Sequence, residues 1–331
     1  MSGLQILWFI LIGVLFSGFF FLEGFDFGVG IASVTLTKDK REVDQTIGTI
    51  GPFWDLNEVW LLTAGGAMFA AMPYWYASLF SGYYNLFLLL LVGLILRGVT
   101  FEFRHHSPTE KGKTFWTKIL GISNFAIPFL LGLIFTSMIQ GVPMDANGNV
   151  WATFTTYVNP LSVVGGVAVV LLSWLHGLNF ITLKTEGPLH DRAKKQANSL
   201  YYILYAGEVV FAVLLAIYTD FIKKHPIGII ALLAVIVLLT VIAHLSVRKN
   251  KQMTAFLSSG LTFIALVALI FQGLFPRVMI SKDGAHDILI QHASSTPYTL
   301  TTMTIVTLCI LPFVLAYISW TYWIFRKRIA K

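Results

Sequence analysis

The feature that most constrains this chain is a series of long apolar runs separated by short polar stretches. Clear examples cover residues 86–96, 163–175, 227–243 and 300–318, each inside a longer apolar segment. A helix needs about 20 residues to cross the hydrocarbon core of a bilayer. Backbone groups in lipid must find hydrogen-bond partners within their own segment, so such runs are expected to be helices. The sequence therefore predicts an all-α integral membrane protein.

The composition agrees with this class, because 56% of the 331 residues are hydrophobic and only 12% are charged. A soluble domain usually carries about 25% charged residues. We expect about nine transmembrane helices with short connections. They are predicted at residues 5–33, 52–71, 75–103, 116–141, 160–183, 199–221, 226–246, 253–274 and 300–325.

Basic residues concentrate in alternate connections, which predicts the orientation of the chain. One set of connections, with the C-terminal tail, holds most of the 23 lysines and arginines: Lys38, Lys40, Arg41, Arg104, Lys111, Lys113, Lys118, Lys184, Arg192, Lys194, Lys195, Arg248, Lys249, Lys251, Arg326, Lys327, Arg328 and Lys331. The opposite set holds Lys223, Lys224, Arg277 and Lys282. We therefore expect the C-terminus in the cytoplasm and the N-terminus outside. The net charge of +7 reflects topology rather than nucleic-acid binding.

Two segments of the chain resemble each other. Residues 21–27 read FLEGFDF, and residues 174–180 read WLHGLNF. An offset of 153 residues relates Glu23 to His176 and also Asp55 to Glu208. We infer a parallel repeat of two four-helix bundles followed by one extra helix. The predicted divisions are residues 1–142 for the first bundle, 143–275 for the second, and 276–331 for an external loop and the ninth helix.

Ionisable residues within the predicted helices are functional candidates, because charge in lipid is costly. The acidic candidates for a proton route are Asp26, Asp55, Glu23, Glu58 and Glu208. Residues three apart share a helix face, as Glu23 and Asp26 do on the first predicted helix. The predicted orientation places all five acids, together with Arg97, in the cytoplasmic half of the membrane. A compact cluster would let Arg97 hold one carboxylate ionised while other carboxylates carry protons. Alternatively, Arg97 and one or two acids form a buried pair that fixes helix packing.

Other residue types point to less specific roles. His176 and His244 are weak candidates for haem ligands, and packed or interfacial histidines are the preferred interpretation. Cys309 is the single cysteine and there is no CxxC motif, so a thiolate metal site is excluded and no metal site is expected. Aromatic residues near the predicted helix ends are interpreted as a membrane-interface belt, namely Tyr74, Trp75, Tyr76, Tyr322 and Trp323.

Several blocks of the sequence resemble one known family. Residues 23–30 read EGFDFGVG and residues 51–71 read GPFWDLNEVWLLTAGGAMFAA. Both are similar to signatures of subunit II of cytochrome bd-type quinol oxidases. Further matches follow in the same order at residues 81–83, Arg97 with 101–104, 140–143, 275–276 and 312–323. The resemblance covers nearly the whole chain.

The resemblance implies a heterodimer in the bacterial cytoplasmic membrane that oxidises quinol and reduces dioxygen to water. Subunit I would carry haem b and haem d, while this chain would ligate no cofactor and would not catalyse alone. This chain would scaffold subunit I and supply a cytoplasmic proton route. Asp26 and Asp55 match acidic positions of that route, with Arg97, Trp54 and Asn57 as supporting residues. Expected partners are subunit I, membrane lipid and, as a further candidate, a small single-helix subunit.

Two other functions are alternatives to an oxidase subunit. A stand-alone proton-coupled transporter also fits internal repeats and buried acids, and it predicts broken helices at matching positions of the two halves. Pro128 has no partner at the matching position, which counts against a transporter. A self-sufficient b-type cytochrome would use His176 and His244. No GxGxxG, P-loop, catalytic-triad or HExxH motif is present.

Overall fold

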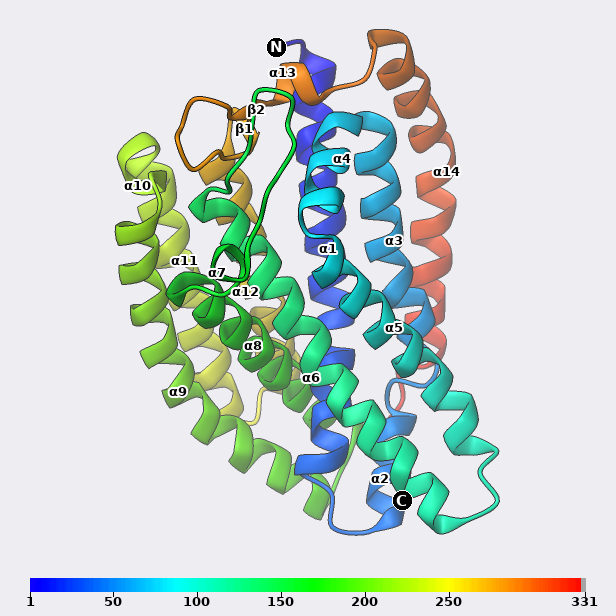
Figure 1. Ribbon diagram of the computed structural model, residues 1–331. Helices are drawn as coiled ribbons and strands as arrows, with labels where there is room; N and C mark the ends of the chain where they lie inside the picture. Colours follow the sequence, from blue (N-terminus) through cyan, green and yellow to red (C-terminus); the bar gives the residue numbers. More distant parts are fainter. Residues whose placement is uncertain (329–331) are drawn as a thin grey trace.

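The computed structural model describes residues 1–328, which fold almost entirely into helices (Figure 1). Lys331, one of the basic residues predicted to be cytoplasmic, lies outside the described residues. The long helices of the described part are α1 (Gly3–Thr35), α3 (Trp54–Ala71), α5 (Tyr84–His105), α6 (Glu110–Gln140), α8 (Pro160–Lys184), α9 (Pro188–Tyr218), α11 (Pro226–Arg248), α12 (Gln252–Leu274) and α14 (Pro297–Ile324).

Within residues 1–328, eight helices are long and apolar enough to cross a membrane. The remaining long helix, α3, has 18 residues and is less apolar, because Asp55, Asn57 and Glu58 lie near its start. It nevertheless packs against α1 and runs beside it through the bundle (Figure 1). The predicted class, a helical membrane protein with several spans, is confirmed.

The prediction of one helix over residues 75–103 is wrong, because the chain breaks between α4 (Pro73–Gly82) and α5. Gly82 lies against the Val150 side chain of a distant loop, with no room for a Cβ atom. The Gly82 carbonyl accepts a hydrogen bond from the Tyr157 hydroxyl (2.5 Å), which satisfies a group that the break releases. A loop far away in sequence therefore occupies the site of the break.

Several short elements connect the long helices. They are α2 (Lys40–Gly48), α7 (Phe154–Tyr157), α10 (Phe221–Lys224), α13 (Ile290–Ala293), β1 (Arg277–Met279) and β2 (Ile288–Leu289). The Asp39 side chain caps α2 by accepting a hydrogen bond from the Glu42 backbone N–H (2.9 Å). The strands form an antiparallel pair at the end of the bundle opposite α2 (Figure 1). These ends are called the α2 end and the β1 end below.

Helices α1 and α8 cross closely near the centre of the bundle. A Cβ atom on Gly28 would overlap the Ser173 carbonyl oxygen and come within 2.7 Å of the Gly177 nitrogen. Gly132 of α6 approaches Gly165 of α8 in the same way. Small residues allow this close approach of helix backbones, and the resulting van der Waals packing favours helix association in lipid.

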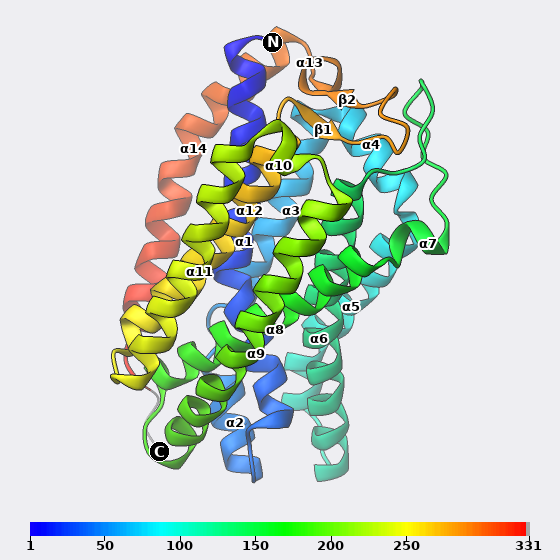
Figure 2. The same ribbon diagram turned by 90° about the vertical axis from the view of Figure 1, so that its left-hand side faces the viewer.

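Many helix contacts among the first four long helices have counterparts among the next four, although the close contact between α9 and α11 has no equal counterpart between α3 and α5. α1 contacts α3 as α8 contacts α9, and α5 pairs with α6 as α11 pairs with α12. α1 also contacts both α6 and α12, and so does α8. Figure 2 shows the second set beside the first, with α8 next to α6.

Helix α14 lies on the outside of the bundle, against α1 and α3 (Figure 1). Near the β1 end, the Trp8 indole N–H donates to the Leu300 carbonyl (3.2 Å). Only 6% of the most apolar 18-residue stretch of α14 is buried within the described chain. The N-terminus and the end of α14 lie at opposite ends of the bundle. Most of α14 is therefore left to contact lipid or another protein.

Candidate functional site

Arg97 is the centre of a buried charged cluster, defined as Glu23 and Asp26 of α1, Glu58 of α3 and Arg97 of α5. The Arg97 guanidinium forms ion pairs with the Glu23 carboxylate and with Glu58 Oε2 (2.7 Å). It lies 4.0 Å from Asp26 Oδ2. The side chains of Arg97, Glu23 and Asp26 have no exposed surface, whereas Glu58 is 20% exposed. Glu58 is therefore the outermost member of the cluster.

Uncharged groups hold the guanidinium in place. Arg97 Nε donates to Asn124 Oδ1 (3.1 Å), and the Asn124 amide donates to the Leu120 carbonyl of its own helix (2.8 Å). The rings of Phe27, Trp54 and Phe101 lie 5.2, 6.0 and 5.9 Å from the Arg97 guanidinium carbon. Aromatic faces attract a desolvated cation, so these rings stabilise the charge of Arg97.

A second polar chain reaches the cluster from α14. The Asn57 side-chain amide donates to Asp26 Oδ2 (2.8 Å) and to the Leu22 carbonyl (3.3 Å). The Tyr322 hydroxyl donates to Asn57 Oδ1 (2.7 Å). Interpreting Tyr322 as part of an interface belt is therefore wrong, and the same holds for Trp75, which is 1% exposed.

Two of the predicted proton-route acids lie away from this cluster. Asp55 is exposed at the start of α3, and its carboxylate accepts a hydrogen bond from the Leu56 backbone N–H (2.8 Å). Glu208 of α9 accepts a hydrogen bond from the Thr240 hydroxyl of α11 (2.6 Å). Neither Asp55 nor Glu208 is among the ion-pair partners of Arg97 within residues 1–328.

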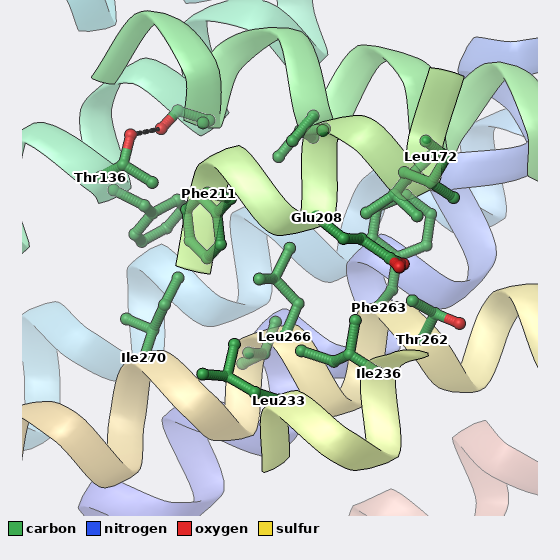
Figure 3. Close-up of a pocket in the computed structure, with 18 of the residues that line it drawn as sticks. Thr136, Leu172, Glu208, Phe211, Leu233, Ile236, Thr262, Phe263, Leu266 and Ile270 are labelled. Carbon is green, nitrogen blue, oxygen red and sulfur yellow. Dashed lines mark hydrogen bonds between the residues drawn. The ribbon is translucent and has the colours of Figure 1, made fainter. Parts of the chain in front are cut away.

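Glu208 instead lines an apolar cavity of about 90 Å³ between α6, α8, α9, α11 and α12, with Phe20 of α1 also in its lining. Figure 3 shows its carboxylate beside Thr262, Phe263 and Ile236. Most of the other lining side chains are aliphatic or aromatic, so the cavity is apolar apart from Glu208 and two threonines. This cavity is separate from the Arg97 cluster, because its lining includes no member of that cluster.

A more polar cavity of about 300 Å³ lies at the α2 end. Asp44, Arg104 and Lys113 line its outer part, and Thr100, Phe101 and Leu120 also line it. Thr100 and Phe101 are one helical turn from Arg97, and Leu120 is one turn from Asn124. The cavity therefore extends from charged residues at the α2 end toward the cluster.

Both candidate histidines use their two ring nitrogens within the protein. His176 lies between Ser259 Oγ (2.8 Å from Nδ1) and the Phe21 carbonyl (3.0 Å from Nε2). His244 lies between the Tyr205 hydroxyl (3.0 Å from Nδ1) and Asn198 Oδ1 (2.9 Å from Nε2). A haem ligand needs a free nitrogen directed at the iron, so these residues do not fit haem ligation.

Among residues 1–328, no group of three or more His, Cys, Asp or Glu side chains is arranged to hold a metal ion.

An ion-pair network joins the connections at the β1 end. The Arg277 guanidinium binds both oxygens of Asp220 (2.8 Å each) and one oxygen of Asp287 (3.4 Å). Partial burial raises the pKa of Asp220, but hydrogen bonds from Arg277 and Lys224 lower it by more, to about 2. The network fixes the β1–β2 pair to the connection between α9 and α11.

Sequence reasoning missed Asn124 and misplaced Tyr322. An amide within the apolar run of α6 was a usable signal for Asn124, because buried amides need partners. For Tyr322 the sequence carried no comparable signal, since tyrosine near a helix end is common in membrane proteins.

Fold and site together define a helical membrane protein of several spans that holds a buried charged cluster formed by three of its helices. Residues 4–325 match the family described as cytochrome bd terminal oxidase subunit II, and the chain belongs to this family. It is therefore a multi-pass protein of the bacterial cytoplasmic membrane and a subunit of a respiratory oxidoreductase complex.

Individual proteins similar to this chain support its membership of the family. The chain is 44% identical to cytochrome bd ubiquinol oxidase subunit 2 of Bacillus subtilis (strain 168), over 100% of this chain and 98% of that protein. It is 30% identical to cytochrome bd-I ubiquinol oxidase subunit 2 of Escherichia coli (strain K12), over 99% of this chain and 96% of that protein. A chain in the structure of bd oxidase from Geobacillus thermodenitrificans has a similar fold, with a TM-score of 0.74, 16% identity, and coverage of 98% and 99%.

Proposed function

We propose that this chain is the haem-free subunit of a quinol:dioxygen oxidoreductase, and that it supplies a proton route from the cytoplasm to a haem-bearing subunit I. The observation that carries the route is the cluster itself, in which one arginine faces three carboxylates. Burying several uncompensated negative charges is strongly unfavourable. A cluster with more carboxylates than cations is therefore suited to take up and release protons.

The route would begin in the polar cavity at the α2 end, which we place in the cytoplasm. Protons would pass Thr100 and Phe101 to Glu58, the partly exposed carboxylate. Glu23 and Asp26 would follow, since both contact Arg97 and are fully buried. This assignment gives Glu58 and Glu23 larger roles than the family resemblance suggests.

We further propose that subunit I docks on the face formed by α3, α5 and α14. Gly65 and Gly66 lie on the open side of α3, where no atom of residues 1–328 lies within 4 Å of an added Cβ. Asp55 is exposed on the same helix, and an ionised carboxylate facing lipid is costly. Contact with a second protein would cover both the open glycines and Asp55. Lipid, and a small single-helix subunit if present, would cover other faces.

Haem b and haem d would then belong to subunit I, with quinol as the substrate of the complex. The engaged nitrogens of His176 and His244 support this assignment. Residues 1–142 and 143–275 would be related by the repeat, with 276–331 as an addition. The exchangeable helix contacts support the relation between the two sets.

A stand-alone transporter is the competing function. It requires broken helices at matching positions of the two halves. The break at Gly82 lies before α5, and a break at His225 between α10 and α11 likewise lies before α11. Neither α5 (Tyr84–His105) nor its counterpart α11 (Pro226–Arg248) is interrupted along its length, which argues against a transporter of this type.

A tagged purification in mild detergent tests the proposal. We expect a larger partner chain, b- and d-type haem bands, and quinol-dependent oxygen uptake. Glu58→Gln and Asp26→Asn should lower oxygen uptake at least tenfold while haem content stays constant, a loss of the size expected when a proton-transfer group is removed. Glu102→Gln is the matched control, because Glu102 is 74% exposed on α5. A colourless chain purified alone from its native host would favour the transporter. Full turnover in Glu58→Gln and Asp26→Asn would exclude the route.

A further inference from the structure

Tyr322 lies at a contact between α14 and the charged cluster. Its hydroxyl donates to Asn57 Oδ1 (2.7 Å), and Asn57 Nδ2 donates to Asp26 Oδ2 (2.8 Å). Its ring stacks on Phe53, with ring centroids 4.5 Å apart and planes 7° from parallel. The Lys184 ammonium binds the backbone carbonyls of Phe325 and Lys327, which follow α14. The α2 end of α14 is thus fixed, although most of the helix is exposed.

Three hydrogen bonds determine which way the Asn57 amide faces, because its NH₂ group also donates to the Leu22 carbonyl (3.3 Å). An asparagine side chain has an oxygen that accepts and an NH₂ group that donates. An ionised carboxylate only accepts, so a stable contact with Asp26 requires the NH₂ group on that side. If nothing bound the oxygen, only the contacts of the NH₂ group with Asp26 and Leu22 would oppose a rotation that turns the oxygen toward Asp26. The Tyr322 hydroxyl adds the restraint on the other side, because it binds the Asn57 oxygen.

We propose that Tyr322 is a positioning residue for the proton route, which fixes the Asn57 amide so that Asp26 can release and accept protons. The inference rests on the proposed proton route. Without Tyr322, the rotated amide would place its oxygen beside the Asp26 carboxylate. Asp26 would then keep its proton, because a protonated carboxyl donates to an amide oxygen and an ionised carboxylate is repelled by it.

A purely structural role makes a different prediction. Stacking on Phe53 and packing of α14 need the aromatic ring and do not need the hydroxyl. Tyr322→Phe keeps the ring and removes the hydroxyl, so it separates the two roles. Tyr218→Phe is the matched control, because Tyr218 is 37% exposed on α9 and lies outside the proposed docking face of α3, α5 and α14.

The experiment uses the complete complex with its haem-bearing partner. Tyr322→Phe should assemble with normal haem content and lower quinol-dependent oxygen uptake about threefold to tenfold, the range given by one lost hydrogen bond. The pH dependence of oxygen uptake should move to higher pH, because Asp26 releases its proton less readily. The charged and titratable groups around Asp26 are Glu23 on α1, Glu58 on α3, Arg97 on α5 and Tyr322 itself on α14. Tyr218→Phe should match the unmodified complex in rate and pH dependence.

A double-mutant cycle with Asn57→Ala identifies the mechanism. If Tyr322 acts through Asn57, Tyr322→Phe should have no further effect once Asn57 is alanine. Additive losses would overturn the proposal, and so would an unchanged rate and pH dependence in Tyr322→Phe. Failure of Tyr322→Phe to assemble while Asn57→Ala assembles would also overturn it, since Tyr322 would then act through packing of α14.

Asp26→Asn distinguishes this inference from the proposed function. Full turnover in Asp26→Asn would remove the proton route and the inference with it. Slow turnover in Asp26→Asn with normal turnover in Tyr322→Phe would remove the positioning role alone and leave the route in place.

Discussion

Replacing Arg97 by an apolar residue should be among the most damaging single changes in this chain. Arg97→Met roughly preserves side-chain length but removes the partner of the Glu23 and Glu58 carboxylates. It also leaves the Asn124 oxygen without its donor. Removing one partner of a buried ion pair costs about 3–5 kcal/mol, because the other charge stays buried and unpaired. Typical proteins have only about 5–15 kcal/mol of total stability.

The assay is the yield of assembled, haem-containing complex, together with its thermal unfolding temperature in detergent. We expect Arg97→Met to lower both sharply. Arg97→Lys should recover part of the yield, because it keeps the charge but loses the planar fork that binds two carboxylates.

A combined variant separates charge from packing. Adding Glu23→Gln, Asp26→Asn and Glu58→Gln to Arg97→Met removes every ionised group of the cluster. Neutral replacement of a whole buried ion group is often tolerated. We therefore expect assembly to recover and oxygen uptake to stay low. Normal yield and unfolding temperature in Arg97→Met alone would refute the reasoning, because the carboxylates would then need no cation.

Three other predictions follow from the structure. Gly28→Ala should destabilise the α1–α8 crossing by about 1–3 kcal/mol, the usual cost of overpacking. Gly207→Ala should be nearly neutral, because no described atom lies within 4 Å of its added Cβ. Thermal unfolding of both variants measures the difference, and equal effects would contradict the prediction. Asp220 has a pKa lowered in the folded protein to about 2, so its ion pair with Arg277 should stabilise the fold above about pH 4 and lose that effect as pH falls toward 2. The difference in unfolding temperature between the unmodified protein and Asp220→Asn should therefore shrink over that interval, and a constant difference would disprove the linkage. His176→Gln should leave the haem bands of the purified complex unchanged, since both nitrogens of His176 bind protein groups; loss of a b-type band would show that the histidine is a ligand.

The class, a helical membrane protein, could be predicted without a structure, because it depends on local properties of the sequence. Apolar runs of about 20 residues identify membrane helices whatever surrounds them. An external loop was predicted within residues 276–331. Its β1–β2 pair and the break at Gly82 were not predicted, because both depend on contacts beyond the local sequence.

The sequence by itself determined that this is a helical membrane protein and that Glu23 and Asp26 share a face of one helix. Spacing places residues on the same face, but it does not say which neighbour that face meets. Only the tertiary structure decided that Glu58 reaches Arg97 while Asp55, three residues earlier on α3, is exposed and is not among the ion-pair partners of Arg97 within residues 1–328. The physical reason is position along the helix axis: Asp55 shares a face with Glu58 but lies about 4.5 Å nearer the start of α3, at about 1.5 Å per residue, so the packing of α3 buries Glu58 more than Asp55.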